Sequence, residues 1–185
     1  PVREAFRQLE AVGFLATGAG RGSYVTDVLG DGLDNLFVAR GALEESATRI
    51  ATEMRRGDVS DLQTSIDAMR VAALARDIVE LERHSIAFHR AIMEASGNTL
   101  LLKLWSSLLI EEHTDITVRL LAGEDLLAVA DSHQPIVDAM QARDTEEAAR
   151  LARIHQEAAP VGAVRGRHPG ALSLGQPPSS ARFLL

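Results

Sequence analysis

Residues 124–158 read EDLLAVADSHQPIVDAMQARDTEEAARLARIHQEA, and this stretch decides the fold. Apolar side chains recur at helical spacing on both sides of a polar centre at Arg143 and Asp144. Asp144, followed by Thr and two Glu, is typical of a helix start and resembles a capping box. We therefore predict one helix over 124–141 and a second from Asp144 to just before Pro160. Because the turn between them is short, the two helices should pack as an antiparallel pair.

The segments before this pair carry further helical patterns. Each begins at a polar capping residue or ends at a glycine or small polar residue, which are the usual boundary signals. Aromatic residues make up 4% of the chain and hydrophobic residues 46%, so a core of Leu, Ala, Ile, Val and Met is expected, which favours helices. The predicted fold is mainly α, a six-helix antiparallel bundle. Its first four helices are predicted at about 33–56, 58–75, 77–95 and 98–121.

The first residues follow a different pattern. Residues 1–12, PVREAFRQLEAV, predict a helix that ends at Gly13. Two short β-prone runs around glycines at 14–26 predict a hairpin. A helix followed directly by a small hairpin is the back half of a winged-helix DNA-binding domain. Since two such small elements bury too little surface to fold alone, we expect the rest of that domain upstream.

These patterns divide the chain into three predicted segments. The recognition helix and wing of a winged helix-turn-helix domain occupy 1–28, and an all-helical effector-binding domain occupies 29–159. Residues 160–185 contain Gly, Pro, Ser and Arg without an apolar period, and they are predicted to be a disordered tail.

The net charge of −7 is unevenly distributed. Residues 1–26 carry +1, residues 27–159 carry −11 and the last 26 residues carry +3, so the middle domain is not expected to contact nucleic acid. The chain has no cysteine, which excludes disulfides and thiolate metal sites. No apolar run approaches the roughly 20 residues that span a bilayer. We expect a soluble cytoplasmic protein without a membrane partner.

Three histidines are predicted to face the interior of the bundle. His133 lies 11 residues before Asp144 and His155 lies 11 residues after it, so equal helix arms place their side chains at the same height. His89 shares a helix face with apolar neighbours. Converging neutral imidazoles suit Zn²⁺ or another first-row metal, and three protein ligands leave a position for an exchangeable ligand. A buried histidine can also be a hydrogen-bonded core residue, so both interpretations stay open.

Several segments resemble the GntR family of bacterial transcription regulators, in its FadR-type branch with an FCD ligand-sensing domain. The resemblance covers about residues 1–158, and the predicted number of helices is closer to the six-helix VanR-like division than to the seven-helix one. The segments that carry it are the recognition helix and wing (1–15 and GRGSYV at 20–25), the R-x-x-x-E opening (Arg40 and Glu44), the F-H and A-S-G-N motifs (88–89 and 95–98) and the closing H…D…A…H spacing (His133, Asp144, Ala148 and His155).

The resemblance implies a homodimeric regulator, usually a repressor, that releases operator DNA when a small carboxylate binds. In many relatives the pocket holds a metal through an Asp, a His four residues later and two further histidines. By position the histidines are His89, His133 and His155, and the cofactor would be a divalent transition metal such as zinc, nickel or manganese. Ser85 stands at the Asp position, and a hydroxyl is a poor replacement for a carboxylate. A metal-binding pocket and a metal-free polar pocket therefore both remain open.

The predicted effector-binding residues are Arg40, Ser85, Asn98 and Arg119. Arg40 and Arg119 could each pair with an effector carboxylate, although Arg40 could equally pair with Glu44 one turn away. Asn98 also suits the N-terminal cap of the helix that follows it.

The predicted DNA-binding residues are Arg3, Arg7, Arg21 and Gly22. Arg3 and Arg7 lie one turn apart on the first helix, where Arg3 is the better candidate for contacts to bases or phosphates. Arg21 and Gly22 at the hairpin tip suit a wing that approaches the DNA backbone or minor groove. The alternative is that these arginines are solvated and pair with nearby glutamates. We expect the intact protein to bind a palindromic site as a dimer, and these 185 residues to bind weakly or not at all.

Three other functions stay open. A three-histidine metal in a helical bundle could activate water in an enzyme, but the sequence lacks the Glu-x-x-His pair of di-iron bundles, and an enzyme is not expected. A regulator could instead hold a long apolar ligand without metal, as the seven-helix relatives do. The domain could also only dimerise and have lost sensing, which Ser85 makes conceivable.

Overall fold

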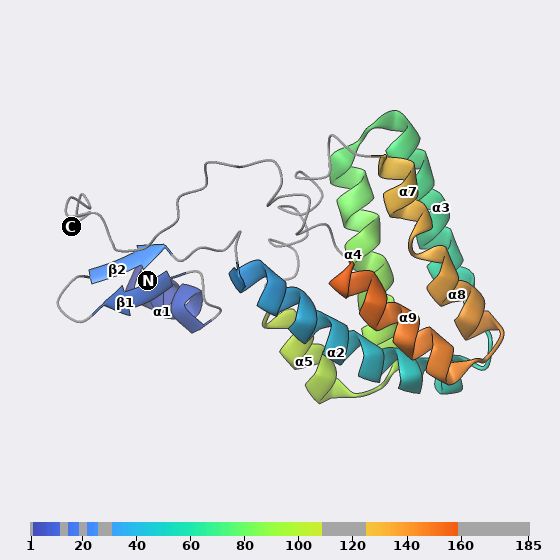
Figure 1. Cartoon of the computed structure of the whole chain (residues 1–185), viewed down its shortest axis with the longest axis horizontal. Coiled ribbons are helices and arrows are strands. Elements are labelled where there is room, and N and C mark those ends of the chain that lie inside the picture. Colours follow the sequence, from blue (N-terminus) through green and yellow to red (C-terminus); the bar gives the residue numbers. More distant parts are fainter. Residues whose placement is uncertain (1, 12–14, 19–21, 26–30, 109–124, 159–185) are drawn as a thin grey trace. The chain divides into compact units, whose positions relative to one another are not determined.

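The computed structural model describes residues 2–11, 15–18, 22–25, 31–108 and 125–158 (Figure 1). Backbone contacts divide the chain into two compact units, and among the described residues the boundary falls between Leu33 and Asp34. The predicted tail, 160–185, lies outside the described residues.

The first unit contains the predicted helix and hairpin. Helix α1 covers Val2–Ala11, and strands β1 (Leu15–Gly18) and β2 (Gly22–Val25) pair antiparallel with Leu15 opposite Val25 and Gly18 opposite Gly22. The hydroxyl of Thr17 donates a hydrogen bond to the Glu10 carboxylate, which connects the hairpin to α1.

The second unit is a helical bundle, which confirms the predicted mainly α fold (Figure 1). Helix α3 packs against α4 and α7, and α8 packs against α9. In Figure 1, α2 and α9 run obliquely past the lower part of α4, and α5 contacts α4. The described helices of this unit are α2 (Asp31–Arg55), α3 (Ser60–Ala75), α4 (Ile78–Ala95), α5 (Thr99–Ser106), α7 (Leu126–Asp131), α8 (Gln134–Gln141) and α9 (Thr145–Glu157).

Polar side chains begin several of these helices by accepting hydrogen bonds from free backbone amides. Asp77 accepts from the Glu80 amide, and Asp144 accepts from the Glu147 amide at 3.1 Å. The predicted start of the last helix at Asp144 is therefore confirmed. Asn98 caps α5 in the same way, through the amides of Leu100 and Leu101, both at 3.1 Å.

The prediction of one continuous helix over 124–141 is wrong. The chain forms α7 and α8 instead, with a turn at Ser132 and His133 between them. Pro135 stands in the first turn of α8. Proline has no N–H to donate to the carbonyl four residues earlier, and its ring clashes with that carbonyl, so a helix cannot continue through it unbroken.

The helix predicted over 98–121 also ends earlier in the structure. Helix α5 ends at Ser106, and Ser107 and Leu108 form a turn. The Ser107 hydroxyl donates to the Leu104 carbonyl at 2.7 Å, a local bond that competes with continuation of the helix. The remainder of the predicted helix lies in 109–124, outside the described residues.

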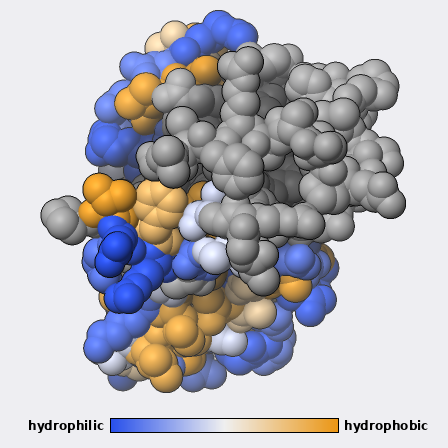
Figure 2. All heavy atoms as spheres, turned by 90° about the vertical axis from the view of Figure 1, so that its left-hand side faces the viewer, coloured by the Kyte–Doolittle hydropathy of each residue, from blue (hydrophilic) through white to orange (hydrophobic). Residues whose placement is uncertain are grey.

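The core of the bundle is mostly aliphatic. Phe88 and Trp105 are fully buried within it. Some apolar side chains reach the surface: Val38 is 58% exposed, Leu100 63% and Leu104 46%. Figure 2 shows apolar side chains gathered beside hydrophilic ones on the face that it presents. Within the described ranges no helix combines the length and the apolar character needed to cross a membrane.

Candidate metal centre

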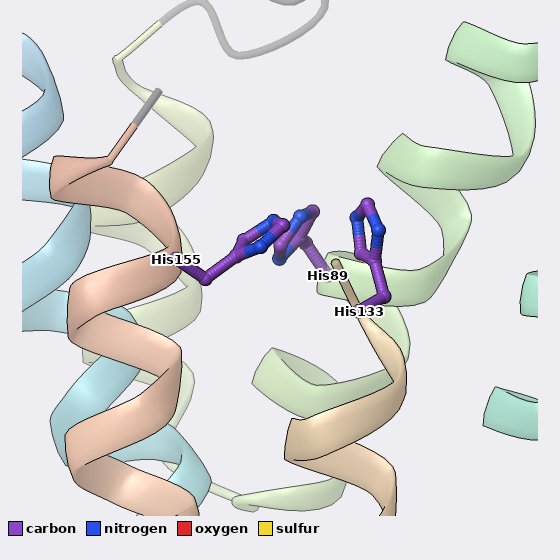
Figure 3. Close-up of side chains that lie close together, drawn as sticks. All are labelled: His89, His133 and His155. Atoms are coloured by element: carbon purple, nitrogen blue, oxygen red, sulfur yellow. The ribbon is translucent and has the colours of Figure 1, made fainter. Parts of the chain in front are cut away.

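Three imidazoles from three parts of the bundle point toward one another (Figure 3). Helix α4 carries His89, the turn between α7 and α8 carries His133, and α9 carries His155. The ring centroids of His133 and His155 are 4.3 Å apart, and that of His89 lies 5.2 Å from each of them. One ligand nitrogen from each ring lies within 4.8 Å of the others. The predicted convergence of these side chains is confirmed.

The break between α7 and α8 orients His133. Its backbone amide donates to Ala130 at 3.3 Å, so the Val129 carbonyl is available to the imidazole instead. The ring Nδ1 lies 3.1 Å from the Val129 carbonyl and 3.2 Å from that of Ala130. Because carbonyls only accept hydrogen bonds, Nδ1 must carry the proton in the neutral ring, which leaves Nε2 as the free ligand atom.

Ser85 lies at this free nitrogen. Its Oγ is 3.5 Å from His133 Nε2, and Ser85 stands one turn before His89 on α4. Ser85, which stands at the Asp position of the family motif, therefore faces the cluster, but it carries a hydroxyl instead of a carboxylate. The neighbouring His84 turns away from the cluster, with Nε2 3.6 Å from the Glu80 carboxylate, as its place about 100° round the helix predicts.

His89 is held from the opposite side by a buried carboxylate. Its Nδ1 lies 2.9 Å from Oε2 of Glu44, and both side chains are at most 5% exposed. Burial acts to raise the pKa of Glu44, but the nearby His89 and Arg40 and the hydrogen bonds from His89 and Trp105 outweigh burial. The pKa of Glu44 is therefore held well below its usual range, and this side chain is a carboxylate.

The other two histidines are neutral at physiological pH. Burial, with smaller contributions from His155 and His89, holds the pKa of His133 well below its usual range. Burial, followed by the proximity of His89, lowers the pKa of His155 to about 3. Metal ligands must be deprotonated imidazoles, so neither ring has to lose a proton before it can bind an ion.

These residues fit a divalent first-row metal. Imidazole nitrogens bind Zn²⁺ at about 2.0–2.1 Å. From nitrogens that lie within 4.8 Å of one another, each ring has to move by less than about 1 Å to reach such an ion. Three imidazole ligands leave room for a further ligand on the ion. The bonds from Nδ1 to Glu44 and to main-chain carbonyls are contacts of the kind that orient metal-binding histidines.

The four predicted effector-binding residues lie in different surroundings. Ser85 belongs to the cluster, whereas Arg40 is 3% exposed with its guanidinium 3.3 Å from Glu44. The side-chain oxygen of Asn98 caps α5. Arg119 lies outside the described residues.

The predicted DNA-binding residues belong to the first unit. Arg3 and Arg7 are exposed on α1, and Arg7 lies 3.9 Å from Glu4 in an ion pair. Gly22 begins β2 opposite Gly18. Arg21 lies outside the described residues.

Two residues beside the histidines were missed as parts of the site. Trp105 lies in the apolar run Leu100–Ile110 of the sequence, which is typical of a core segment, and it is fully buried, but its indole also donates to Glu44 at 2.7 Å. Gln156 donates to Glu44 at 2.8 Å, and nothing in the sequence singled it out.

The sequence did contain a signal for the role of Glu44. In α2, polar residues recur at every fourth position, and the structure buries all four of them. These residues are Arg40, Glu44, Thr48 and Thr52.

Sequence comparison identifies the helical unit. Residues 35–158 match the FCD domain family. A probable D-xylose utilization operon transcriptional repressor from Paenarthrobacter nicotinovorans is 35% identical over 148 residues, which is 79% of this chain. The chain spans 64% of the length of that repressor.

Solved structures share the fold. Escherichia coli McbR/YncC superposes with a TM-score of 0.70 at 19% identity, over 89% of this chain and 83% of that one. A putative GntR transcriptional regulator from Rhodococcus sp. RHA1 gives a TM-score of 0.62 at 23% identity, over 89% and 79% of the two chains. The relatives are transcription regulators, as predicted, and not enzymes. The chain therefore belongs to the FCD-domain family of GntR-type transcription regulators.

Proposed function

We propose that the helical unit senses a small organic acid at a divalent metal held by His89, His133 and His155. We further propose that the intact protein is a homodimeric repressor that binds operator DNA through the α1 and β1–β2 unit. The similarity to a transcriptional repressor, of whose length this chain spans 64%, supports this role. A helix followed by a hairpin supports a recognition helix and wing.

The convergence of the three histidines carries the sensing proposal. His133 and His155 have lowered pKa values and are neutral, so the imidazoles themselves offer little charge to an anionic effector. A bound divalent ion would supply that positive charge and a coordination position for a carboxylate. The Ser85 hydroxyl, next to His133, can donate a hydrogen bond to the same ligand.

Metal analysis tests the site directly. Purified protein is dialysed and analysed for zinc, nickel and manganese, beside a His133→Ala/His155→Ala double variant. His84→Ala is the matched control, because it removes a histidine of α4 that points away from the cluster. We expect metal in the wild type and in the control and its loss in the double variant. Equal metal content in all three proteins would refute the assignment.

Effector binding is tested by thermal unfolding of metal-loaded and metal-free protein with a panel of small organic acids. A ligand that binds only the folded state raises the unfolding temperature. We expect an acid that stabilises the loaded protein and has no effect on the metal-free protein. Stabilisation of the metal-free protein by a long-chain acyl ligand would instead support an apolar-ligand sensor.

DNA binding is tested with the protein encoded by the intact gene and DNA fragments selected from the genome. We expect dimers in solution, binding that falls as salt rises, and weaker binding by Arg3→Ala. The effector identified above should reduce the affinity for the selected DNA. Failure to select any sequence would contradict the role as an operator-binding repressor.

A further inference from the structure

Glu44 is the point at which four helices meet. Each of its two oxygens accepts two donors. Oε1 lies 3.3 Å from an Arg40 guanidinium nitrogen and 2.7 Å from Nε1 of Trp105 on α5. Oε2 lies 2.9 Å from Nδ1 of His89 on α4 and 2.8 Å from the Gln156 amide on α9. With both oxygens occupied in this way, the carboxylate cannot rotate without losing buried hydrogen bonds.

This carboxylate determines which nitrogen of His89 is free. An ionised carboxylate only accepts hydrogen bonds, so the Nδ1 that faces Glu44 carries a proton. In the neutral ring, Nε2 then holds the lone pair. The main-chain carbonyls of Val129 and Ala130 impose the same arrangement on His133. Two rings of the cluster are thus prepared in the same tautomer by two different kinds of acceptor.

A close contact between α2 and α9 keeps Glu44 and its Gln156 partner together. A Cβ atom placed on Gly41 would lie 3.3 Å from Cγ and 3.4 Å from the carbonyl oxygen of Arg153 on α9. The same hypothetical atom would lie 3.7 Å from Cβ of Gln156. Glycine at this position therefore allows α9 to approach α2 closely enough for Gln156 to reach Glu44, three residues further along α2.

We propose that Glu44 is a positioning residue of the metal site, which fixes His89 with Nε2 directed at the ion and connects the site to α2 and α5. The inference rests on the proposed function, because it assigns a role toward the metal bound by the three histidines. A carboxylate–histidine–metal arrangement raises the basicity of the ligand and fixes its orientation. Glu44 does not itself contact the ion.

Zinc titration of Glu44→Gln is the first test. Glutamine keeps the size of the side chain, but its amide group cannot replace a carboxylate that accepts four donors. Loss of such an outer partner typically weakens metal binding 10–100-fold, so we expect a fall of about that size in Zn²⁺ affinity measured by calorimetry. Glu45→Gln is the matched control, since Glu45 is the adjacent residue and pairs with Arg49 near the surface at 3.3 Å. The control should bind Zn²⁺ within about twofold of the wild type.

The single tryptophan gives a second readout in the same titration. Trp105 donates to the carboxylate that also binds His89, so occupation of the site should change its fluorescence. We expect the change in the wild type and in Glu45→Gln, and a much smaller change in Glu44→Gln at saturating Zn²⁺.

The tautomer of His89 can be measured without any metal. Nitrogen-15 NMR of the imidazoles in the metal-free wild type, recorded at a pH where the His89 ring is neutral, should show a protonated Nδ1 and a bare Nε2 on His89. Glu44→Gln should shift this equilibrium. Trp105→Phe and Gln156→Leu each remove one donor to Glu44 without a change of charge, and each should weaken Zn²⁺ binding less than Glu44→Gln. Trp105→Phe is the cleaner of the two, because the Gln156 amide nitrogen also lies 3.4 Å from both ring nitrogens of His89. Circular dichroism establishes whether each variant is folded. If Glu44→Gln does not fold, Trp105→Phe and Gln156→Leu still test the inference.

The outcomes separate the two proposals. The inference would be overturned, and the metal site left intact, if Zn²⁺ binding were lost in His133→Ala/His155→Ala but unchanged in Glu44→Gln. If Glu44→Gln does not fold, unchanged binding in both Trp105→Phe and Gln156→Leu would have the same meaning. Absence of Zn²⁺ binding by the wild type would overturn the metal site, and the NMR measurement would still decide whether Glu44 fixes His89. A neutral His89 ring that carries its proton on Nε2 and not on Nδ1 in the metal-free wild type would overturn the positioning role.

Discussion

The Nδ1 atom of His133 lies 3.1 Å from the carbonyl oxygen of Val129, a carbonyl that an unbroken helix would have bonded to the His133 backbone amide. The break is due to Pro135, which cannot donate to the carbonyl of Asp131. A residue that interrupts the backbone ladder thus supplies the acceptor that orients a candidate metal ligand. The interruption is part of the site.

Pro135→Ala should weaken metal binding. Alanine restores an N–H and favours helix, so residues 131–136 gain a continuous helical alternative in which the Val129 carbonyl bonds to the backbone. The His133 ring then loses its acceptor, and we expect Zn²⁺ affinity to fall by about tenfold in calorimetric titrations. Asp138→Ala, on the exposed face of α8, is the control. Unchanged affinity in Pro135→Ala would show that other contacts orient His133.

Ser85→Asp should strengthen metal binding. The Ser85 hydroxyl already lies 3.5 Å from His133 Nε2, so a carboxylate at this position can reach the ion together with the three imidazoles. We expect Zn²⁺ affinity to rise on the order of tenfold or more, which is ~1.4 kcal/mol or more. Thr64→Asp adds the same charge on an exposed part of α3 and should leave the affinity unchanged. A rise of equal size in both variants would mean that net charge, and not ligation, is responsible.

Sequence patterns predicted the parts of the site that depend on local regularity. The equal distances of His133 and His155 from Asp144 gave their common height, because both arms are helical and the turn is short. The same reasoning overlooked Pro135, since apolar residues keep a helical period on both sides of it. Proline indicates a helix break, but the helical period of the apolar residues around it favoured one continuous helix.

Contacts between distant segments could not be predicted in this way. Glu44 and Gln156 are 112 positions apart, and their contact depends on the approach of α9 to Gly41, which no local pattern encodes. Trp105 satisfied the pattern of a core residue and is one, so periodicity gave no reason to assign its indole N–H a partner. The ion pair of Arg40 with Glu44 was predicted as one of two alternatives because it lies within one helix.

The stability of the metal-free protein should fall as the pH drops below neutrality. An unfolded histidine titrates near about 6.5, whereas the pKa of His155 is lowered to about 3 and that of His133 is also well below its usual range. The unfolded state therefore binds more protons over this window, and stability is complete above about pH 6.5 and is lost as the pH falls toward the folded-state values. Each histidine contributes a slope of at most about 1.4 kcal/mol per pH unit.

Urea unfolding at about pH 7.5 and about pH 5.5 measures this loss. The His133→Gln/His155→Gln variant should show a flatter dependence, because the two groups that resist protonation are gone. A wild-type dependence as flat as that of the variant would contradict the assignment of both rings as neutral imidazoles.

Gly41→Val should separate α9 from α2 and disturb the site without touching a histidine. Its Cβ would meet the backbone carbonyl of Arg153 at 3.4 Å, and the two further methyl groups of valine have no room in that contact. We expect a loss of about 1–3 kcal/mol in the free energy of unfolding, the usual range for an overpacked interior. Zn²⁺ affinity should fall as well, because His155 and Gln156 are both on α9. Ala42→Val, on the exposed side of the same helix, controls for the helix propensity of valine and should change stability by less than about 1 kcal/mol. Equal effects of the two substitutions would show that the contact between α2 and α9 at Gly41 does not hold the site together.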